Sequence, residues 1–129
     1  MEEEVVQEVV RLVNGIRRQE GLTELTMDSL LSQIAWEKCR DMASHGYFGH
    51  QSPTYGSPFE MLDRYGVKYS AAGENLAKGQ KTASAVVEAW MKSESHRANL
   101  LNRAYTRIGV GLVRDSRGIL LWAQLFTGL

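Results

Sequence analysis

The sequence has few cysteines and prolines, and its formal net charge is zero. Its 129 residues include one cysteine and two prolines, and 15 basic side chains balance 15 acidic ones. Because a single cysteine excludes an intrachain disulfide, the hydrophobic core must hold the fold, and 43% of the residues are hydrophobic. The scattered Lys and Arg residues form no basic stripe. We therefore expect one domain over residues 1–129 that does not bind nucleic acid.

Long hydrophobic runs are missing as well. No stretch approaches the ~20 apolar residues of a membrane-spanning helix, so we expect no membrane span. The opening residues MEEEVVQEVV are acidic and lack the basic start of a signal peptide. This segment alone predicts either a cytosolic protein or one that begins after a removed leader. Cys39 lies in an apolar helical stripe, which favours a buried residue over a reactive thiol.

Helical periodicity dominates the first half of the chain. Apolar residues recur every three or four positions from Val5 to Ile16, and again from Leu31 to Ala43. Thr26 or Asp28 is the expected N-cap of the second helix. The sequence SPFE, which starts at Ser57, is a capping box and predicts a third, short helix.

The pattern changes toward the C-terminus. A fourth helix is predicted from Thr82, with WMKSESH as its last turns, and KYSAAGENLAKG before it reads as extended and irregular. After LLN the apolar residues alternate, and RDSRG separates two such runs, which predicts a hairpin. Helices followed by a terminal hairpin favour a layered α+β domain.

Motifs of familiar enzyme classes are absent. The chain has no HExxH, no phosphate-binding loop and no G-x-S-x-G. The candidates for chemistry are three histidines and Glu74. His50 is the most suggestive because it lies in a loop rich in Gly and Pro. A favourable contact at a helix C-terminus accounts for a histidine at position 45. The local sequence indicates that Glu74 is a solvated carboxylate in a turn. His96 reads locally as a residue at a helix end.

Read together, several segments point to a family. The ordered segments FGHQSP, GENLA, WMKSESHRANLL, IGVG and WAQLF resemble the CAP superfamily (cysteine-rich secretory proteins, antigen 5 and pathogenesis-related 1). The likeness is to its compact, cysteine-poor bacterial branch and runs from about Val5 to Phe126. It implies an α-β-α sandwich, with a small, mainly antiparallel sheet between helical layers. It also implies a central cavity lined by two histidines and two acids, where some members hold a divalent metal, usually zinc.

The resemblance assigns the cavity residues of this chain. The loop histidine is His50, the acid of the GEN motif is Glu74, and the second histidine is His96. Ser93 stands where the eukaryotic members carry the second acid. The resemblance thus implies His50 and His96 as candidate zinc ligands, with Glu74 as a third ligand or as a partner that orients an imidazole. With serine at 93, acid–base catalysis by two carboxylates lacks one group.

Other side chains receive supporting roles. Asn75 and Asn99 carry amides suited to satisfying backbone groups around the site. Trp36, Trp90 and Trp122 are expected in the core rather than on a surface that stacks on a ligand.

We expect a non-catalytic binding module, secreted or in the cell envelope, for a cell-wall, lipid or protein ligand. The alternative is a divalent-metal-dependent, peptidase-like hydrolase that uses His50, His96 and Glu74. A third function, as a structural protein of stress or sporulation, is not separated from the first by the sequence.

Overall fold

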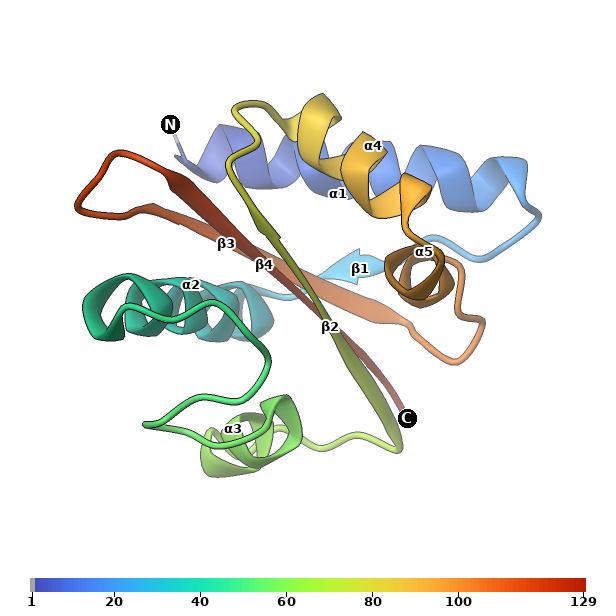
Figure 1. Cartoon of the computed structure of the whole chain (residues 1–129). Helices are drawn as coiled ribbons and strands as arrows, with labels where there is room; N and C mark the ends of the chain where they lie inside the picture. Colours follow the sequence, from blue (N-terminus) through green and yellow to red (C-terminus); the bar gives the residue numbers. More distant parts are fainter. Residues whose placement is uncertain (1) are drawn as a thin grey trace.

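The computed structural model describes residues 2–129. Five helices and four strands follow one another along the chain (Figure 1). Their order is α1 (Glu2–Gln19), β1 (Thr26–Met27), α2 (Ser29–His45), α3 (Pro58–Arg64), β2 (Ala71–Lys78), α4 (Ala83–Lys92), α5 (Glu94–Leu100), β3 (Arg107–Arg114) and β4 (Leu120–Gly128). None of the helices within the described residues combines the length and the hydropathy needed to cross a membrane.

The strands form one mixed sheet in the order β1-β3-β4-β2. The hairpin β3–β4 and the pair β2–β4 are antiparallel, whereas the short β1 pairs with β3 in parallel. Helices cover both faces: α1, α4 and α5 lie on one side and α2 and α3 on the other (Figure 1). The predicted α-β-α sandwich is therefore confirmed, and β2 is an edge strand of its sheet.

Each face of the sheet carries its own hydrophobic cluster. The first cluster joins α1 and α4 to the sheet and includes Val9, Trp90 and Trp122. The second joins α2 and α3 to the other face and includes Leu31, Ile34 and Leu62. Because strand side chains alternate between faces, neighbouring residues of one strand contribute to different clusters.

Glycines bring α2 directly onto β3. A Cβ atom at Gly109 would overlap the α2 backbone at Leu31 and Ser32, and one at Gly111 would overlap it at Trp36. The IGVG segment therefore permits a close approach of helix and strand. Cys39 lies in this contact, fully buried, and burial raises the pKa of its thiol, as expected for a core residue.

Helix starts follow the predicted caps. Asp28 rather than Thr26 caps α2, because its side chain accepts a hydrogen bond from the Leu31 backbone, whereas Thr26 belongs to β1. Ser57 forms the full capping box of α3 with Glu60, and Thr82 caps α4. Local side-chain hydrogen bonds thus set three of the helix boundaries.

Three expectations from the sequence were wrong. The segment read as extended and irregular contains the regular strand β2, which pairs with β4 along its whole length. The predicted fourth helix does not continue through residues 93–96, because Ser93 is extended (φ −103°, ψ 123°) and α5 is a separate helix. Trp36 is 38% exposed, unlike the buried Trp90 and Trp122, because it lines an open hollow between α2, β3 and the start of α1.

Candidate functional site

His50 and Glu74 form a direct pair at the edge of the sheet. Nδ1–H of His50 donates to Oε1 of Glu74 at 2.7 Å. Glu74 comes from the edge strand β2 and its side chain is 2% exposed, whereas the His50 imidazole, from the loop after α2, is 57% exposed. A buried carboxylate thus fixes the orientation of an imidazole that remains accessible to solvent. The Glu74 side chain is not the solvated turn residue that its local sequence indicates.

Lys38 supplies a buried positive charge next to this pair. It is 1% exposed, and its Nζ donates to the backbone carbonyl of His50 at 2.9 Å. Burial lowers the pKa of the Lys38 ammonium, while the negative charges of Glu74 and Asp41 oppose that shift. The Lys38 Nζ also lies 5.1 Å from the centroid of the Tyr47 ring. Lys38 therefore both anchors the His50 loop and offsets the charge of Glu74.

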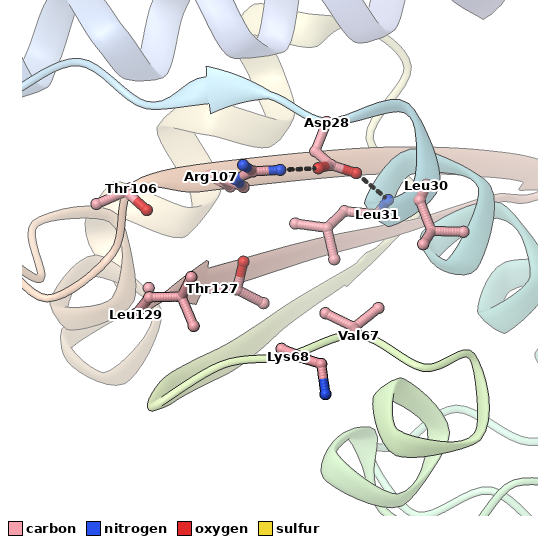
Figure 2. Close-up of a pocket in the computed structure, with 10 residues that line it drawn as sticks. Asp28, Leu30, Leu31, Val67, Lys68, Thr106, Arg107, Thr127 and Leu129 are labelled. Carbon is pink, nitrogen blue, oxygen red and sulfur yellow. Dashed lines mark hydrogen bonds and ion pairs between the residues drawn. The ribbon is translucent and has the colours of Figure 1, made fainter.

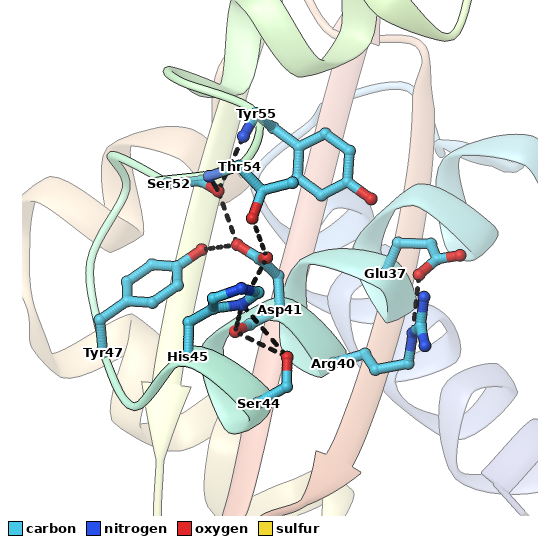
Figure 3. A network of polar contacts seen from close by, with 9 residues as sticks. All are labelled: Glu37, Arg40, Asp41, Ser44, His45, Tyr47, Ser52, Thr54 and Tyr55. Carbon is cyan, nitrogen blue, oxygen red and sulfur yellow. Dashed lines mark hydrogen bonds and ion pairs between the residues drawn. The ribbon is translucent and has the colours of Figure 1, made fainter.

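Asp41, one turn further along α2, organises the loop that carries His50 (Figure 3). Its carboxylate accepts hydrogen bonds from Ser52 Oγ and Thr54 Oγ1, both at 2.6 Å, and from the Tyr47 hydroxyl. Burial acts to raise the pKa of Asp41, but these hydrogen bonds outweigh it and hold the pKa below its usual range. The loop is thus tied to α2 on both sides of His50.

His45 belongs to this loop network and not to the site. It is the last residue of α2, and its Nδ1 lies 3.1 Å from Asp41 Oδ1 (Figure 3). Its side chain is 52% exposed.

His96 is held from the other face of the sheet. Asn75 lies next to Glu74 on β2, and its Nδ2 donates to the backbone carbonyl of His96 at 3.1 Å. Asn99 Nδ2 bonds Asn75 Oδ1 at 2.9 Å and the carbonyl of Glu74 at 3.2 Å. These amides fix α5 against β2. The His50 loop and the His96 helix therefore meet the same strand edge from opposite faces.

Each residue of the GEN motif has a separate task. A Cβ atom at Gly73 would lie 2.9 Å from Asn99 Oδ1 and nearer still to the Tyr105 hydroxyl, so glycine is required for α5 to approach. Glu74 orients His50, and Asn75 anchors His96. Three consecutive residues thus join the two histidine-bearing segments to one strand.

The two histidines differ in electrostatics. The hydrogen bond to Glu74 raises the pKa of His50 above its usual value. Burial lowers the pKa of His96, and the positive charge of His50 lowers it further. Near neutral pH, His50 is the readier to carry a proton and His96 the readier to stay neutral.

His50, His96 and Glu74 are the side chains of the site that could ligate a metal ion. Within residues 2–129, no three His, Cys, Asp or Glu side chains lie close enough together to form a ligand group. Glu74 bonds Nδ1 of His50, which leaves Nε2 of that ring free. A carboxylate that orients an imidazole in this way is typical of metal-binding histidines.

Ser93 leaves the site without a second acid. It is the residue between α4 and α5, and its side chain makes no capping hydrogen bond. Glu88 and Glu94, the nearest acids in sequence, are both exposed.

Cavities elsewhere have different linings. One of about 260 Å³ near the start of α2 contains none of the predicted site residues. There the Asp28 carboxylate accepts from Arg107 Nη1 at 2.7 Å and from the Leu31 amide at 2.9 Å (Figure 2). Asp28 and Arg107 satisfy each other, whereas Lys68, which also lines the cavity, has no ion pair among residues 2–129.

Comparison with known proteins identifies similar chains. Residues 10–126 match the Cysteine-rich secretory protein family, CAP. The chain is 52% identical to YkwD of Bacillus subtilis (strain 168) over 120 residues, which cover 93% of this chain and 46% of YkwD. It is 39% identical to the membrane protein YlbC of the same organism over 107 residues, 83% of this chain and 31% of YlbC.

A solved structure gives the same result. The extracellular protein containing an SCP domain from Bacillus anthracis str. Ames matches with a TM-score of 0.92 at 34% identity, covering 99% of this chain and 41% of that chain. The chain therefore spans less than half the length of these relatives. The matches confirm the resemblance that the ordered motifs indicate.

Two residues that hold the His50 loop were not predicted from the sequence. Lys38 and Asp41 read as ordinary polar positions of an amphipathic helix, yet both are buried and contact the His50 loop. A signal was present, because Lys38 and Asp41 flank the buried Cys39 and Met42 on α2.

Proposed function

Because the chain belongs to the Cysteine-rich secretory protein (CAP) family, we propose that it is a non-catalytic binding module of the bacterial cell surface. Its ligand contacts His50 and His96 at the edge of β2. A secreted or envelope-associated location fits the extracellular relative from Bacillus anthracis. The ligand is a component of the envelope: cell-wall material, a lipid or a protein.

One observation carries this proposal: the only carboxylate of the site is already engaged. Glu74 is buried, bonded to His50 and placed beside Lys38. Acid–base catalysis by two carboxylates needs both groups within reach of the substrate, and Glu74 is held by His50. Ser93 offers no acid in its place, and Cys39 is fully buried. The geometry therefore supports recognition by imidazole hydrogen bonds better than it supports bond cleavage.

Ligand binding and turnover can be measured together. We would incubate the protein with soluble cell-wall fragments, measure binding by calorimetry, and search for cleavage products by mass spectrometry. Wild-type protein should bind without forming product, whereas a His50→Ala/His96→Ala double variant should lose binding. His45→Ala is the matched control, because His45 is exposed and outside the site. Equal affinity of the double variant and the wild type, or product formed by wild type alone, would contradict the proposal.

A second candidate is a divalent-metal-dependent hydrolase. The observation that favours it is the free Nε2 of His50, oriented by Glu74 through Nδ1. His50 and His96 would hold the ion, and Glu74 would keep the His50 ring in place. A bound divalent cation would supply Lewis acidity toward a substrate carbonyl. Zinc titration of metal-free wild type and of the double histidine variant tests this candidate. Equal, negligible binding by both would exclude it.

A further inference from the structure

A second hollow lies next to the site. It has a volume of about 310 Å³ and is formed by the end of α2, the first loop residues after it, the end of β2 and the β3–β4 turn. Its lining includes Tyr47, Phe48, Lys78, Asp115 and Arg117. None of these residues has a part in the site described above, apart from the Tyr47 hydroxyl that binds Asp41.

This hollow shares a loop and the strand β2 with the His50 site. Phe48 and His50 belong to one loop, and Lys78 and Glu74 to one strand. The Lys78 Nζ lies 5.8 Å from the Phe48 ring centroid, and His50 bonds Glu74 at 2.7 Å. Glu74 and Lys78 share a face of the strand because side chains alternate, and they are about 13 Å apart at ~3.3 Å per residue. An elongated ligand of that length reaches both places.

The lining combines an exposed aromatic ring with cations. Phe48 is 45% exposed, and the Arg117 side chain is 66% exposed. Among residues 2–129, Lys78 forms no ion pair. Arg117 pairs with Asp115, whose carboxylate also accepts hydrogen bonds from backbone amides of the turn. Asp115 thus holds the turn, and the two cations are presented to solvent beside a flat apolar face. An acyl chain would need an apolar lining throughout, which this hollow does not have.

We propose that the hollow is a subsite for an acidic sugar unit of a cell-wall glycan. This inference rests on the proposed function and names the ligand of the same site. The ring of Phe48 stacks on the less polar face of the sugar, while Lys78 and Arg117 donate to its carboxylate. The neighbouring unit of the glycan reaches the imidazoles of His50 and His96.

The test uses a tetrasaccharide of alternating N-acetylglucosamine and N-acetylmuramic acid, which carries carboxylates, and the neutral N-acetylglucosamine tetramer. Calorimetry should show that Phe48→Ala and Lys78→Gln each weaken binding of the acidic tetrasaccharide by about tenfold, as loss of ~1.4 kcal/mol implies. Lys78→Gln should leave the weaker binding of the neutral tetramer unchanged. Phe59→Ala and Lys92→Gln are matched controls, since Phe59 is 47% exposed and the Lys92 side chain is 75% exposed.

The outcomes separate this inference from the proposed function. If wild type binds the acidic tetrasaccharide and Phe48→Ala and Lys78→Gln bind it as tightly as the controls, the subsite is wrong. If wild type binds intact cell walls through the two histidines but not the tetrasaccharide, the sugar assignment is wrong and the proposed function stands. Histidine-dependent binding to acidic phospholipid vesicles, or to a protein instead of either sugar, likewise overturns the sugar assignment. Failure of wild type to bind any envelope component overturns both.

Discussion

Glu74 and Asn75 are neighbours on one strand, yet they face opposite sides of the sheet into different surroundings. The Glu74 side is ionic: its buried carboxylate bonds the imidazole of His50, whose backbone carbonyl accepts from the Lys38 ammonium. The Asn75 side is neutral, and amide hydrogen bonds to Asn99 and to the backbone of His96 fill it. The difference teaches that the ionic face sets the charge and orientation of His50, whereas the neutral face fixes the position of His96.

The histidines follow the same division. On the ionic side the pKa of His50 is raised by its carboxylate partner. On the neutral side the pKa of His96 is lowered, first by burial and then by the charge of His50. A ligand at the strand edge therefore meets one imidazole that readily carries charge and one that is readily neutral.

Removing the buried ammonium should have the largest effect. Lys38→Met leaves the Glu74 charge without its buried cation, and we expect a loss of about 3 kcal/mol in the free energy of unfolding, measured by urea denaturation. Adding Glu74→Gln to Lys38→Met should recover most of this loss. Lys92→Met, at an exposed position, is the control. A Lys38→Met variant as stable as that control would show that the ionic side does not depend on Lys38.

Breaking the neutral side should cost somewhat less. Asn75→Ala removes hydrogen bonds to the His96 carbonyl and to Gln124 and should lower the unfolding free energy by about 2 kcal/mol. Hydrogen exchange should also become faster in α5. The pKa of His50, measured by NMR, should not change, because its carboxylate partner remains. A large change in that pKa would mean that the two faces are not independent.

Neutralising the carboxylate should cost less stability than removing the ammonium, because Asp41 still offsets the charge of Lys38. In Glu74→Gln we expect the pKa of His50 to fall toward the ordinary histidine value of about 6.5. A raised pKa in the folded state contributes stability that is complete below that ordinary value and is lost as the pH rises through the folded-state pKa. Because His50 is half-exposed, the contribution is under about 1 kcal/mol.

The measurement is an NMR titration of wild type and Glu74→Gln, with unfolding followed between pH 5.5 and 8. Wild type should lose this part of its stability over the upper half of that interval, and the variant should not. An unchanged His50 pKa in Glu74→Gln would contradict the hydrogen bond between His50 and Glu74.

Restoring the missing acid should have the smallest effect on folding. Ser93 and His96 are three residues apart at the start of α5, so their side chains share one side of the helix. Ser93→Asp should change the unfolding free energy by less than about 0.5 kcal/mol. Calorimetry should nevertheless show zinc bound about tenfold more tightly than by Ser93→Asn, which has the same shape without the charge. Equal zinc affinities of Ser93→Asp and Ser93→Asn would show that an acid at position 93 does not contribute to metal binding.

The sequence predicted the elements of the fold correctly where they depend on residues close together in the chain. Helix starts at Asp28, Ser57 and Thr82 depend on hydrogen bonds between residues three apart, so spacing alone predicts them. Strand β2 escaped because its residues, AAGENLAK, are mostly small or polar and show no alternation. Pairing with β4 and the approach of α5 over Gly73 create that strand, and both are long-range effects.

The candidate site divides in the same way. The motifs named His50, Glu74 and His96, because residues that contact a site recur in ordered segments of the family. Lys38 and Asp41 lie next to apolar positions of α2, but a charged residue there is usually solvated, and contacts with the His50 loop bury these two. The break at Ser93 was missed because serine neither stops nor favours a helix strongly. Trp36 was placed in the core because hydropathy does not show that its side chain lines an open hollow beside β3.

The most direct test of the central claim is an NMR titration of the imidazole resonances of His50, His45 and His96 with a soluble acidic cell-wall fragment. If the strand edge of β2 is the binding site, the signals of His50 and His96 will shift together and saturate at one ligand concentration, and the fragment will remain intact. His45 will serve as the internal reference and stay unchanged. Saturable binding that leaves the signals of both His50 and His96 unmoved would contradict the account.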